Sequence, residues 1–386
     1  MSSLYIHIPF CSTFCGYCDF YSVKKESVND NYINNFLIKL ISDIKYQIEY
    51  FNIKEIDTAY IGGGTPSILG EKISVLLNAL NEIPSFSPVE FTVEVNPESL
   101  NKTFLNACLK GGVNRLSLGI QTFHEPSRDA VNRKGDANAL LSGLSLVNRH
   151  FSGGKDGRSL SVDLITGLPY HNKNIVLDDI NRLLDYKVDH VSLYSLSVEN
   201  DTPLEAKLKT KTLSLPEEDV SDSLWLTGRE ALLKAGFDHY EVSNFALPGK
   251  KCLHNMRYWN MDGWLGAGPS ASGTIINGEQ AYLTRYTYLP DTDRYINEQL
   301  SMKNEKLVEI EELDKTMFLK ECLLMGYRIK EGPDKKKFKN RFGISIEDCI
   351  TQTLSSWKNK NIMLFLNSFL IEAFEEIDNN PRFLCV

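Results

Sequence analysis

The sequence predicts an α/β fold: a partial TIM-type barrel of six βα units, followed by a small, mostly helical C-terminal domain. Six apolar runs rich in β-branched residues alternate with helix-like segments through the first two-thirds of the chain. Strands separated by helices of that length pair in parallel, and six such units favour a barrel over an all-β fold or a helical bundle. From about Glu305 the pattern turns helical, and 386 residues leave room for a second, smaller domain.

The predicted elements follow one another in regular order. The strands are expected at residues 4–10, 58–62, 90–95, 115–120, 160–165 and 190–198. The helices are expected at residues 31–50, 71–81, 102–110, 137–150, 175–186 and 216–235, and residues 239–245 are a candidate for a further strand. We therefore assign the barrel to residues 1–240, a linking segment to 241–300 and the C-terminal helical domain to 301–386.

Charge and hydropathy narrow the class of protein. Lys+Arg 42 against Asp+Glu 50 gives a net charge of −8, the wrong sign for a general nucleic-acid binder. No apolar run approaches the length that spans a bilayer, and the N-terminus shows no basic region followed by an apolar stretch. We therefore expect a cytoplasmic protein that is not an integral membrane protein.

Cysteine usage points to a metal centre. Three of the eight cysteines, Cys11, Cys15 and Cys18, fall within eight residues, directly after the first predicted strand. Disulfides are disfavoured in the reducing cytoplasm, so clustered cysteines indicate metal binding there. The scattered cysteines are interpreted as small core residues: Cys108, Cys252, Cys322, Cys349 and Cys385.

An iron–sulfur cluster fits the three clustered cysteines better than zinc does. A structural zinc site generally takes four protein ligands, and no second CxxC pair follows in the chain. His7 is a candidate fourth ligand, although its place on a strand favours a core or barrel-facing side chain. A cube-shaped [4Fe–4S] cluster with three cysteine ligands leaves one iron open, as a site that binds a ligand requires.

Polar residues follow or interrupt the ends of several predicted strands. The second strand is followed by Gly62-Gly63-Gly64-Thr65-Pro66, a turn where backbone can approach a ligand closely. Glu94, Gln121 and Asp163 lie at the ends of the third, fourth and fifth strands. Each carboxylate alone could be a paired structural group. Because these residues occupy corresponding ends of successive strands, a shared ligand is the better explanation.

The C-x3-C-x2-C spacing after a first strand resembles the signature of the radical S-adenosylmethionine (SAM) superfamily. Together with the strand-end motifs, it resembles the coproporphyrinogen-oxidase-like branch over about residues 4–300. The resemblance implies that the open iron chelates the methionine part of SAM and that an electron from the cluster cleaves the sulfonium to a 5′-deoxyadenosyl radical. It also implies SAM-binding roles for Tyr5, Gly63, Gly64, Thr65, Glu94, Gln121, Arg133 and Asp163.

The segment His254-Asn-Met-Arg-Tyr258-Trp259 resembles the H-N-x-x-Y-W motif of the heme chaperones in this branch. In that resemblance His254 offers an imidazole to heme iron, and the two aromatic side chains offer flat apolar surface to the porphyrin. Cys252 is an alternative ligand, Arg257 a candidate partner for a propionate, and a buried, satisfied histidine the alternative interpretation of His254.

The other relative in the branch is the oxygen-independent coproporphyrinogen III oxidase. Its signature carries a further cysteine where this chain has Phe20, and its N-terminal arm is longer than the ten residues that precede Cys11. The resemblance therefore implies a protein that binds heme, a [4Fe–4S] cluster and SAM, and that passes heme to acceptor hemoproteins such as respiratory, membrane-associated ones. No residue is assigned a catalytic role, and a homodimer is one assembly to test. Two alternatives stay open: a radical SAM enzyme such as the coproporphyrinogen III oxidase, and a zinc-stabilised binding module.

Overall fold

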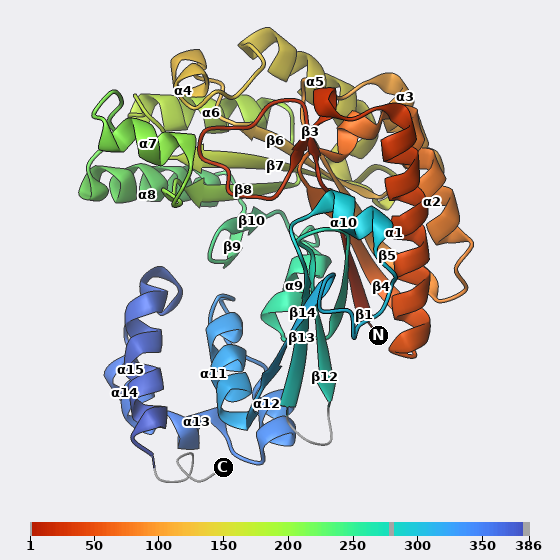
Figure 1. Cartoon of the computed structure of the whole chain (residues 1–386). Coiled ribbons are helices and arrows are strands. Elements are labelled where there is room, and N and C mark those ends of the chain that lie inside the picture. The colour runs from red at the N-terminus through yellow and green to blue at the C-terminus, as the bar shows by residue number, and fades with distance from the viewer. Residues whose placement is uncertain (1, 278–281, 381–386) are drawn as a thin grey trace.

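The computed structural model describes residues 2–277 and 282–380, and its centre is a twelve-stranded sheet that curls into a partial barrel (Figure 1). Six neighbouring strands pair in parallel, in chain order. They are β1 (Ser2–Ile8), β4 (Ile56–Gly63), β5 (Phe86–Val95), β6 (Arg115–Gln121), β7 (Ser159–Thr166) and β8 (His190–Ser195). The predicted (β/α)6 barrel is thus confirmed, with each of the six expected strands in place.

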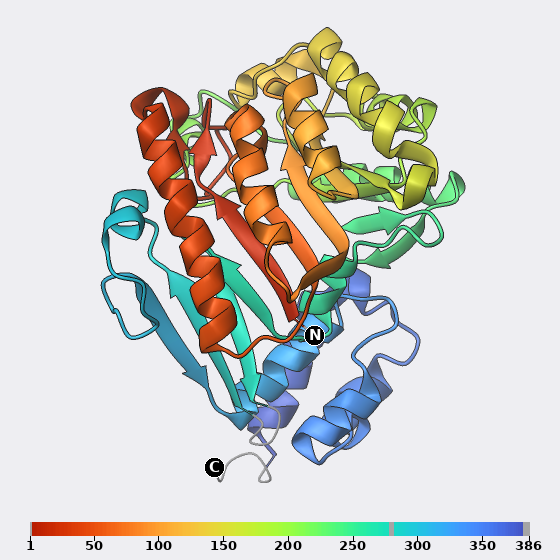
Figure 2. The same cartoon turned by 90° about the vertical axis from the view of Figure 1, so that its right-hand side faces the viewer.

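The six expected helices are also present, and they cover the outer face of the barrel sheet (Figure 2). They are α1 (Asp30–Tyr50), α2 (Ile73–Asn81), α3 (Lys102–Lys110), α5 (Ala137–Phe151), α6 (Lys173–Asp185) and α8 (Glu218–Lys234). Four of them begin at an Asn or Asp whose side chain accepts a backbone N–H of the first turn: Asn29, Asn101, Asp136 and Asn172. Such caps satisfy donors that the helix itself leaves open, which fixes where each helix starts.

Shorter elements connect these units. The strands are β2 (Phe10–Cys11), β3 (Val23–Lys24), β9 (Asp238–Glu241) and β10 (Asn244–Ala246), and the helices are α4 (Glu125–Ala130) and α7 (Pro203–Lys209). Single 3-10 turns are η1 (Lys25–Ser27), η2 (Pro66–Lys72), η3 (Ser152–Gly157) and η4 (Met363–Phe365). The single strand expected at residues 239–245 is wrong, because the chain turns at Val242 and Ser243 and forms the antiparallel pair β9–β10.

The sheet continues on the other side of β1. After α9 (Leu253–Trp259), strand β11 (Trp264–Ala267) pairs in parallel with β1, and β12 (Ser272–Asn277), β13 (Tyr282–Tyr288) and β14 (Val308–Leu313) extend the sheet antiparallel. Strand β14 lies where a helical pattern was expected to begin. Residues 241–300 therefore supply strands to the main sheet, and the domain boundaries near residues 240 and 300 stay a prediction.

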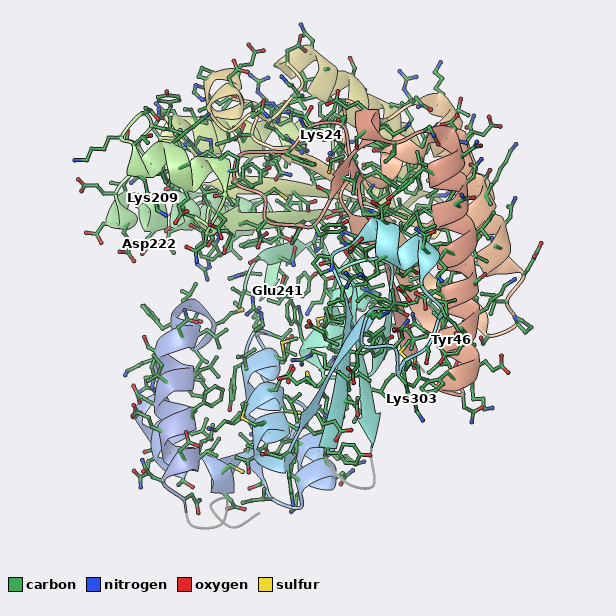
Figure 3. The ribbon with its side chains drawn as sticks, viewed as in Figure 1. Lys24, Tyr46, Lys209, Asp222, Glu241 and Lys303 are labelled. Carbon is green, nitrogen blue, oxygen red and sulfur yellow. The ribbon has the colours of Figure 1, made fainter. Side chains whose placement is uncertain are left out.

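Helices α10 (Thr292–Asn297), α11 (Lys315–Gly326), α12 (Lys335–Phe342), α13 (Ile346–Cys349), α14 (Thr351–Ser356) and α15 (Leu366–Asp378) complete the chain. Those after β14 surround a second hydrophobic core, to which Phe318, Phe342 and Phe369 belong, apart from the barrel core. The β9–β10 turn reaches this part of the chain, because Val242 N–H donates to the carbonyl of Arg328 at 3.0 Å. Glu241, labelled in Figure 3, lies at this junction between the two cores.

Within the described part of the chain, no helix is long and apolar enough to cross a lipid bilayer. The longest helix, α1, is instead fixed to the sheet extension through a buried carboxylate. Asp43 is fully buried and accepts hydrogen bonds from the hydroxyls of Tyr288 and Tyr295 at 2.5 and 2.6 Å and from Gln47 Nε2 at 3.0 Å. Helix α1, strand β13 and helix α10 are therefore joined at one point.

We predict that Asp43→Ala lowers the free energy of unfolding by about 2–4 kcal/mol, because three buried donors lose their acceptor. Chemical denaturation monitored by circular dichroism measures the effect. Asp30→Ala, in the exposed first turn of the same helix, should cost less than about 1 kcal/mol. Equal losses for the two variants would contradict the role given to Asp43.

Candidate functional site

The three clustered cysteines lie on the loop that begins at β2, at the carboxyl ends of the barrel strands. Cys11 and Cys15 are partly buried and Cys18 is exposed. The loop is held from outside by backbone: Gly16 N–H donates to the carbonyl of Val131 at 2.7 Å, and Leu204 N–H donates to the carbonyl of Gly16 at 2.8 Å. Desolvation raises the pKa of the Cys11 thiol and also that of the Cys18 thiol, to about 11, although the Cys18 residue as a whole is exposed, so both keep their protons until a metal displaces them.

A chain of hydrogen bonds connects two of these thiols through the neighbouring strand ends. Cys11 Sγ lies 3.6 Å from Thr65 Oγ1, which accepts from Asn96 Nδ2 at 3.0 Å. Arg133 donates through Nη2 to Asn96 Oδ1 at 2.8 Å and through Nη1 to Cys15 Sγ at 3.3 Å. The predicted residues Thr65 and Arg133 are thus brought to the cysteines. Asn96, which the sequence analysis did not single out, joins them.

The glycine turn after β4 fits closely around the cysteine loop. Gly64 N–H donates to the carbonyl of Ile8 at 2.9 Å, and a Cβ at Gly64 would lie 2.7 Å from Phe10 O and 3.0 Å from Cys11 Sγ. Gly63 has a φ of +106°, and a Cβ there would lie 2.7 Å from the His7 ring. Only glycine allows the backbone of this turn to pack so closely against the cysteine loop.

The donor set suits an iron–sulfur cluster with a bound anionic group. Arg133 is buried, and its Nε has no hydrogen-bond partner among the described residues. A buried guanidinium with an open N–H is a site for a carboxylate. In the described part of the chain, no three His, Cys, Asp or Glu side chains converge to hold a single metal ion. A cube-shaped cluster does not need such convergence, because each thiolate binds a different iron.

Two carboxylates line the interior of the barrel below the loop. Glu94 Oε1 accepts from the hydroxyl of Tyr60 at 2.8 Å, and Asp163 Oδ2 accepts from Ser117 Oγ at 3.0 Å. Burial and the nearby charge of Asp163 raise the pKa of Glu94 to about 7. Tyr5, on the adjoining strand, has its hydroxyl 3.2 Å from His7 Nδ1. The predicted polar residues Tyr5, Glu94 and Asp163 therefore all lie in the interior of the barrel.

Gln121 lies close to Asn96 and Arg133 because a glycine, Gly119, leaves room between them. The sequence analysis did not single out Gly119. Gln121 has a φ of +69°, and a Cβ at Gly119 would lie 2.9 Å from Asn96 Oδ1, 3.0 Å from Arg133 Nη2 and 3.1 Å from Gln121 Nε2. The absent side chain of Gly119 is what lets these three polar groups come together. All of the predicted SAM-binding residues lie at this end of the barrel or in its interior.

Helix α9, which carries the H-N-x-x-Y-W segment, lies at the opposite end of the barrel, where the strands begin (Figure 1). Glu90 of β5 caps it, accepting from the backbone N–H groups of Leu253 and His254, both at 2.9 Å. Cys252 is buried, and its Sγ lies 3.4 Å from Glu90 Oε1. The sequence analysis did not single out Glu90. A charged residue at the start of a predicted strand could have drawn attention to it, but the helix that it caps could not be identified from sequence.

His254 is fully buried, and both of its ring nitrogens are engaged. Nδ1 lies 3.0 Å from Thr58 Oγ1 and Nε2 lies 2.8 Å from the Tyr258 hydroxyl. Burial and the charge of Arg257 lower the pKa of His254 to about 3, so the ring is neutral. Arg257 itself is paired with Asp57 and Asp262. In this conformation both ring nitrogens of His254 are engaged, and the Arg257 guanidinium already pairs with two carboxylates.

Residues 5–183 match the radical SAM superfamily. The chain is 33% identical to the heme chaperone HemW of Lactococcus lactis over 94% of this chain and 90% of that protein. It belongs to the HemW family of radical SAM proteins. Family membership implies a [4Fe–4S] cluster and SAM, in agreement with the cysteine loop and the polar interior.

Further relatives agree with this assignment. HemW of Bacillus subtilis is 30% identical over 94% of this chain and 93% of that protein. A mitochondrial mouse protein, radical S-adenosyl methionine domain-containing protein 1, is 31% identical over 86% of this chain and 74% of its own. The solved structure of coproporphyrinogen III oxidase (HemN) from Escherichia coli superimposes with a TM-score of 0.75 at 19% identity, covering 98% of this chain and 90% of that one. That likeness confirms the fold.

We predict that SAM binds more weakly at pH 6 than at pH 8, by up to about tenfold, because Glu94 with a pKa of about 7 becomes protonated at the lower pH. An ionised carboxylate attracts the cationic SAM and accepts its hydroxyl hydrogen bonds more strongly. Calorimetric titration of the reconstituted protein measures this dependence. Glu94→Gln should flatten it and the exposed Glu82→Gln should preserve it, whereas an unchanged profile in Glu94→Gln would exclude Glu94 as its source.

Proposed function

We propose that the chain is a cytoplasmic heme chaperone that binds heme together with a [4Fe–4S] cluster and SAM, and that delivers heme to acceptor hemoproteins. The observation that carries this proposal is the identity of 30–33% with proteins named heme chaperone HemW, over 94% of this chain in two of them. Phe20 supports the same choice, because it stands where the sequence analysis expected a cysteine in the related oxidase.

In this proposal Cys11, Cys15 and Cys18 hold the cluster, which supplies an electron and one iron open to the methionine part of SAM. The chain's own residues position both groups. Thr65 and Arg133 contact two of the thiols, and the turn at Gly63 and Gly64, packed against the Cys11 loop, would contact the methionine part of SAM. The remaining interior residues would orient SAM through hydrogen bonds and charge: Tyr5, Glu94, Gln121 and Asp163.

His254 stays the sequence-based candidate for a heme ligand. For Nε2 to reach iron, the ring must give up its hydrogen bond with Tyr258, and α9 must move from the end of the barrel. The proposed acceptors are hemoproteins, among them respiratory and membrane-associated ones. A homodimer is part of the proposal as an assembly to be measured by light scattering, with and without heme.

We predict that anaerobic reconstitution with iron and sulfide yields about four irons per chain and a broad charge-transfer absorption. The double variant Cys11→Ser/Cys15→Ser should lose both, because two of the three thiolate ligands are gone. Cys108→Ala, which removes a buried thiol of α3, should keep them. A protein purified without oxygen that contains one zinc and no sulfide would contradict the cluster assignment.

We predict that hemin binds to the full-length chain with a Soret band, and that heme passes to an apo-hemoprotein added afterwards. The alternative activity is tested in parallel on coproporphyrinogen III, under anaerobic reducing conditions with SAM. Product analysis by chromatography should find the substrate unchanged. Efficient decarboxylation of its propionates would replace the chaperone by an oxygen-independent coproporphyrinogen oxidase.

A further inference from the structure

The C-terminal helices, α11–α15, hold the end of α9, the helix that carries the H-N-x-x-Y-W segment. Lys337 of α12 donates through Nζ to the carbonyl of Asn260 at 2.8 Å and pairs with the carboxylate of Asp262. Arg341, on the same helix, donates through Nη2 to the carbonyl of Met261 at 3.2 Å. The Met261 side chain is itself buried in the second hydrophobic core. The residues that follow α9 are therefore packed into the C-terminal helices.

A further contact joins the last turn of α9 to the residues that follow α11. The Arg328 guanidinium lies over the ring of Trp259, 4.8 Å from its centroid. A cation in this position is attracted to the face of the ring. Together with Lys337 and Arg341, Arg328 is the third cation from this part of the chain that contacts residues 259–262. We therefore expect the last turn of α9 to follow any displacement of the C-terminal helices.

The junction between this body and the barrel has unpaired polar atoms on both of its sides. Glu241 Oε1 and Asn244 Oδ1, on the barrel side, are buried and have no hydrogen-bond partner among the described residues. The same is true of Arg328 Nε and Trp259 Nε1 on the other side. The two sides are close, because Val242 N–H donates to the Arg328 carbonyl at 3.0 Å. Separation at these four atoms would thus break no hydrogen bond between described residues.

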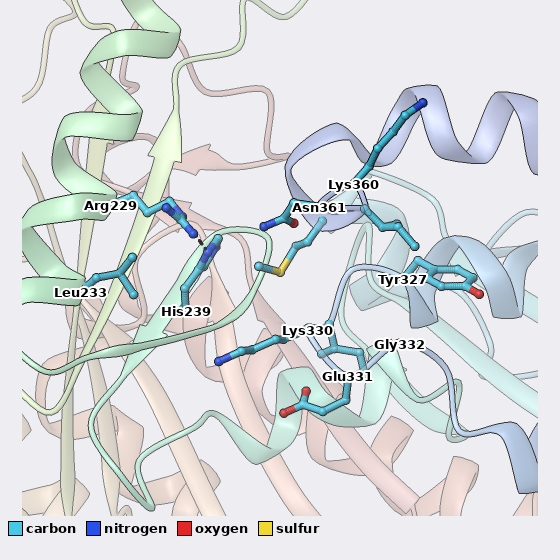
Figure 4. Close-up of a pocket in the computed structure, with 12 residues that line it drawn as sticks. Arg229, Leu233, His239, Tyr327, Lys330, Glu331, Gly332, Lys360 and Asn361 are labelled. Carbon is cyan, nitrogen blue, oxygen red and sulfur yellow. Dashed lines mark hydrogen bonds between the residues drawn. The ribbon is translucent and has the colours of Figure 1, made fainter. Parts of the chain in front are cut away.

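A cleft of about 400 Å³ lies beside this junction, as Figure 4 shows. Helix α8 and strand β9 form one of its walls, and residues 327–332 and 360–363 form the other. The walls belong to different hydrophobic cores. Interfaces between separately packed units are the places where relative movement is expected. The cleft therefore leaves room for the C-terminal helices to shift against the barrel without either core being disrupted.

Few contacts join the two walls of the cleft. Lys330 N–H donates to the carbonyl of Tyr240 at 3.0 Å, and the Lys330 ammonium pairs with Asp238 at 2.7 Å. Lys251, on the barrel side, lies 3.4 Å from Glu331 and 3.6 Å from Asp238. The side chains of Lys330 and Asp238 are 57% and 39% exposed, so their attraction is screened by solvent. The junction can therefore tilt about its backbone hydrogen bonds at small cost.

We propose that the C-terminal helices act as a lever on the H-N-x-x-Y-W segment: they move with the last turn of α9 and so take the Tyr258 hydroxyl away from His254 Nε2. The inference rests on the chaperone function proposed above, with His254 as the heme ligand. His254 lies at the start of α9, where Glu90 of the barrel accepts its backbone N–H. Tyr258 lies in the turn that the C-terminal helices hold.

A tilt of α9 about its capped start would uncover one nitrogen of His254 and leave the ring in place. The Tyr258 hydroxyl, now 2.8 Å from Nε2, would move with the last turn. The other nitrogen, Nδ1, would keep its contact with Thr58 Oγ1 at 3.0 Å. A metal-binding imidazole is usually oriented by a hydrogen bond at its second nitrogen. The tilted helix therefore presents an imidazole that is already oriented for iron.

Opposing contributions make the closed position of α9 one of two accessible states. The Tyr258 ring packs against Trp264 of β11 with centroids 4.8 Å apart, and Arg257 pairs with Asp57 of β4, so both contacts resist the tilt. Met261 has a φ of +48°, which is strained for a residue other than glycine, and it lies where α9 joins the C-terminal helices. Heme that binds Nε2 binds only the tilted state and so shifts the population towards it.

The test compares Lys330→Glu with the wild-type, full-length, reconstituted protein. The change places two like charges beside each other at Asp238, which favours separation of the junction. Hydrogen–deuterium exchange at residues 254–262 should become faster. Hemin should bind roughly three- to tenfold faster, because more of the chain is in the binding-competent state.

The matched control is Lys335→Glu, which replaces an ion pair with Glu347 inside the C-terminal helices. It should leave both exchange at residues 254–262 and hemin binding at wild-type values. A charge swap then separates the lever from a general loosening of the fold. Adding Asp238→Lys to Lys330→Glu restores an ion pair of opposite polarity, so exchange and hemin binding should return towards wild type. Thermal unfolding confirms that each variant is folded.

The outcomes decide between the lever and the function on which it rests. Faster exchange in α9 together with faster hemin binding, both reversed by the charge swap, supports the lever. Unchanged exchange in α9, or wild-type hemin binding despite faster exchange, would overturn the lever and leave the chaperone function standing, because hemin still binds. A wild-type chain that binds no hemin while its cluster is intact would overturn both.

Discussion

The site depends on one buried guanidinium. Arg133 donates to the Cys15 thiol, to the Asn96 side chain and, at 2.8 Å, to the carbonyl of Gly119. It therefore ties the cysteine loop to two neighbouring barrel strands. Burying this charge is costly, and its Nη1 and Nη2 donors offset the cost by bonding to all three of these groups, so the positions of the loop and of both strand ends are determined together. The cluster cysteines, the glycine turn and the carboxylates can share a ligand because this group fixes their separation.

The interior of the barrel differs from the apolar filling that such barrels usually have. Inward side chains from its strands include Tyr5, Tyr60, Glu94, Ser117 and Asp163, all hydrogen-bonded. At the far end, α9 closes the interior with His254 and Tyr258, and the His254 ring lies 5.3 Å from that of Tyr60. One polar column thus runs from the cluster loop to the family's aromatic segment. The cysteine-loop end and the α9 end of the barrel are therefore connected through side chains that contact one another.

Local sequence patterns made much of the barrel and of the cysteine-loop end of the site predictable. The cysteine spacing, the glycine turn and carboxylates such as Glu94 all sit at the ends of strands whose apolar runs are easily recognised. Asn96, Gly119 and Glu90 were missed because their importance depends on which strands are neighbours, and sequence does not reveal that directly. Helix α9 has seven residues and β11 has four, too few to show a period, so neither was expected. His254 shows the limit of motif reasoning, because one of its two hydrogen bonds is made with Thr58, which lies far away in the chain.

The pairing of β11 with β1 has a consequence for how the protein is made. Leu4 lies beside Leu265 and Ile6 beside Ala267, so β1 gains one of its two neighbours only after some 260 further residues have been synthesised. Contacts so distant in sequence are slow to form, and a waiting strand with an open edge is prone to pair with the wrong partner. The cysteine loop follows that strand directly. The thiols of this loop are therefore synthesised well before the sheet beside them is complete.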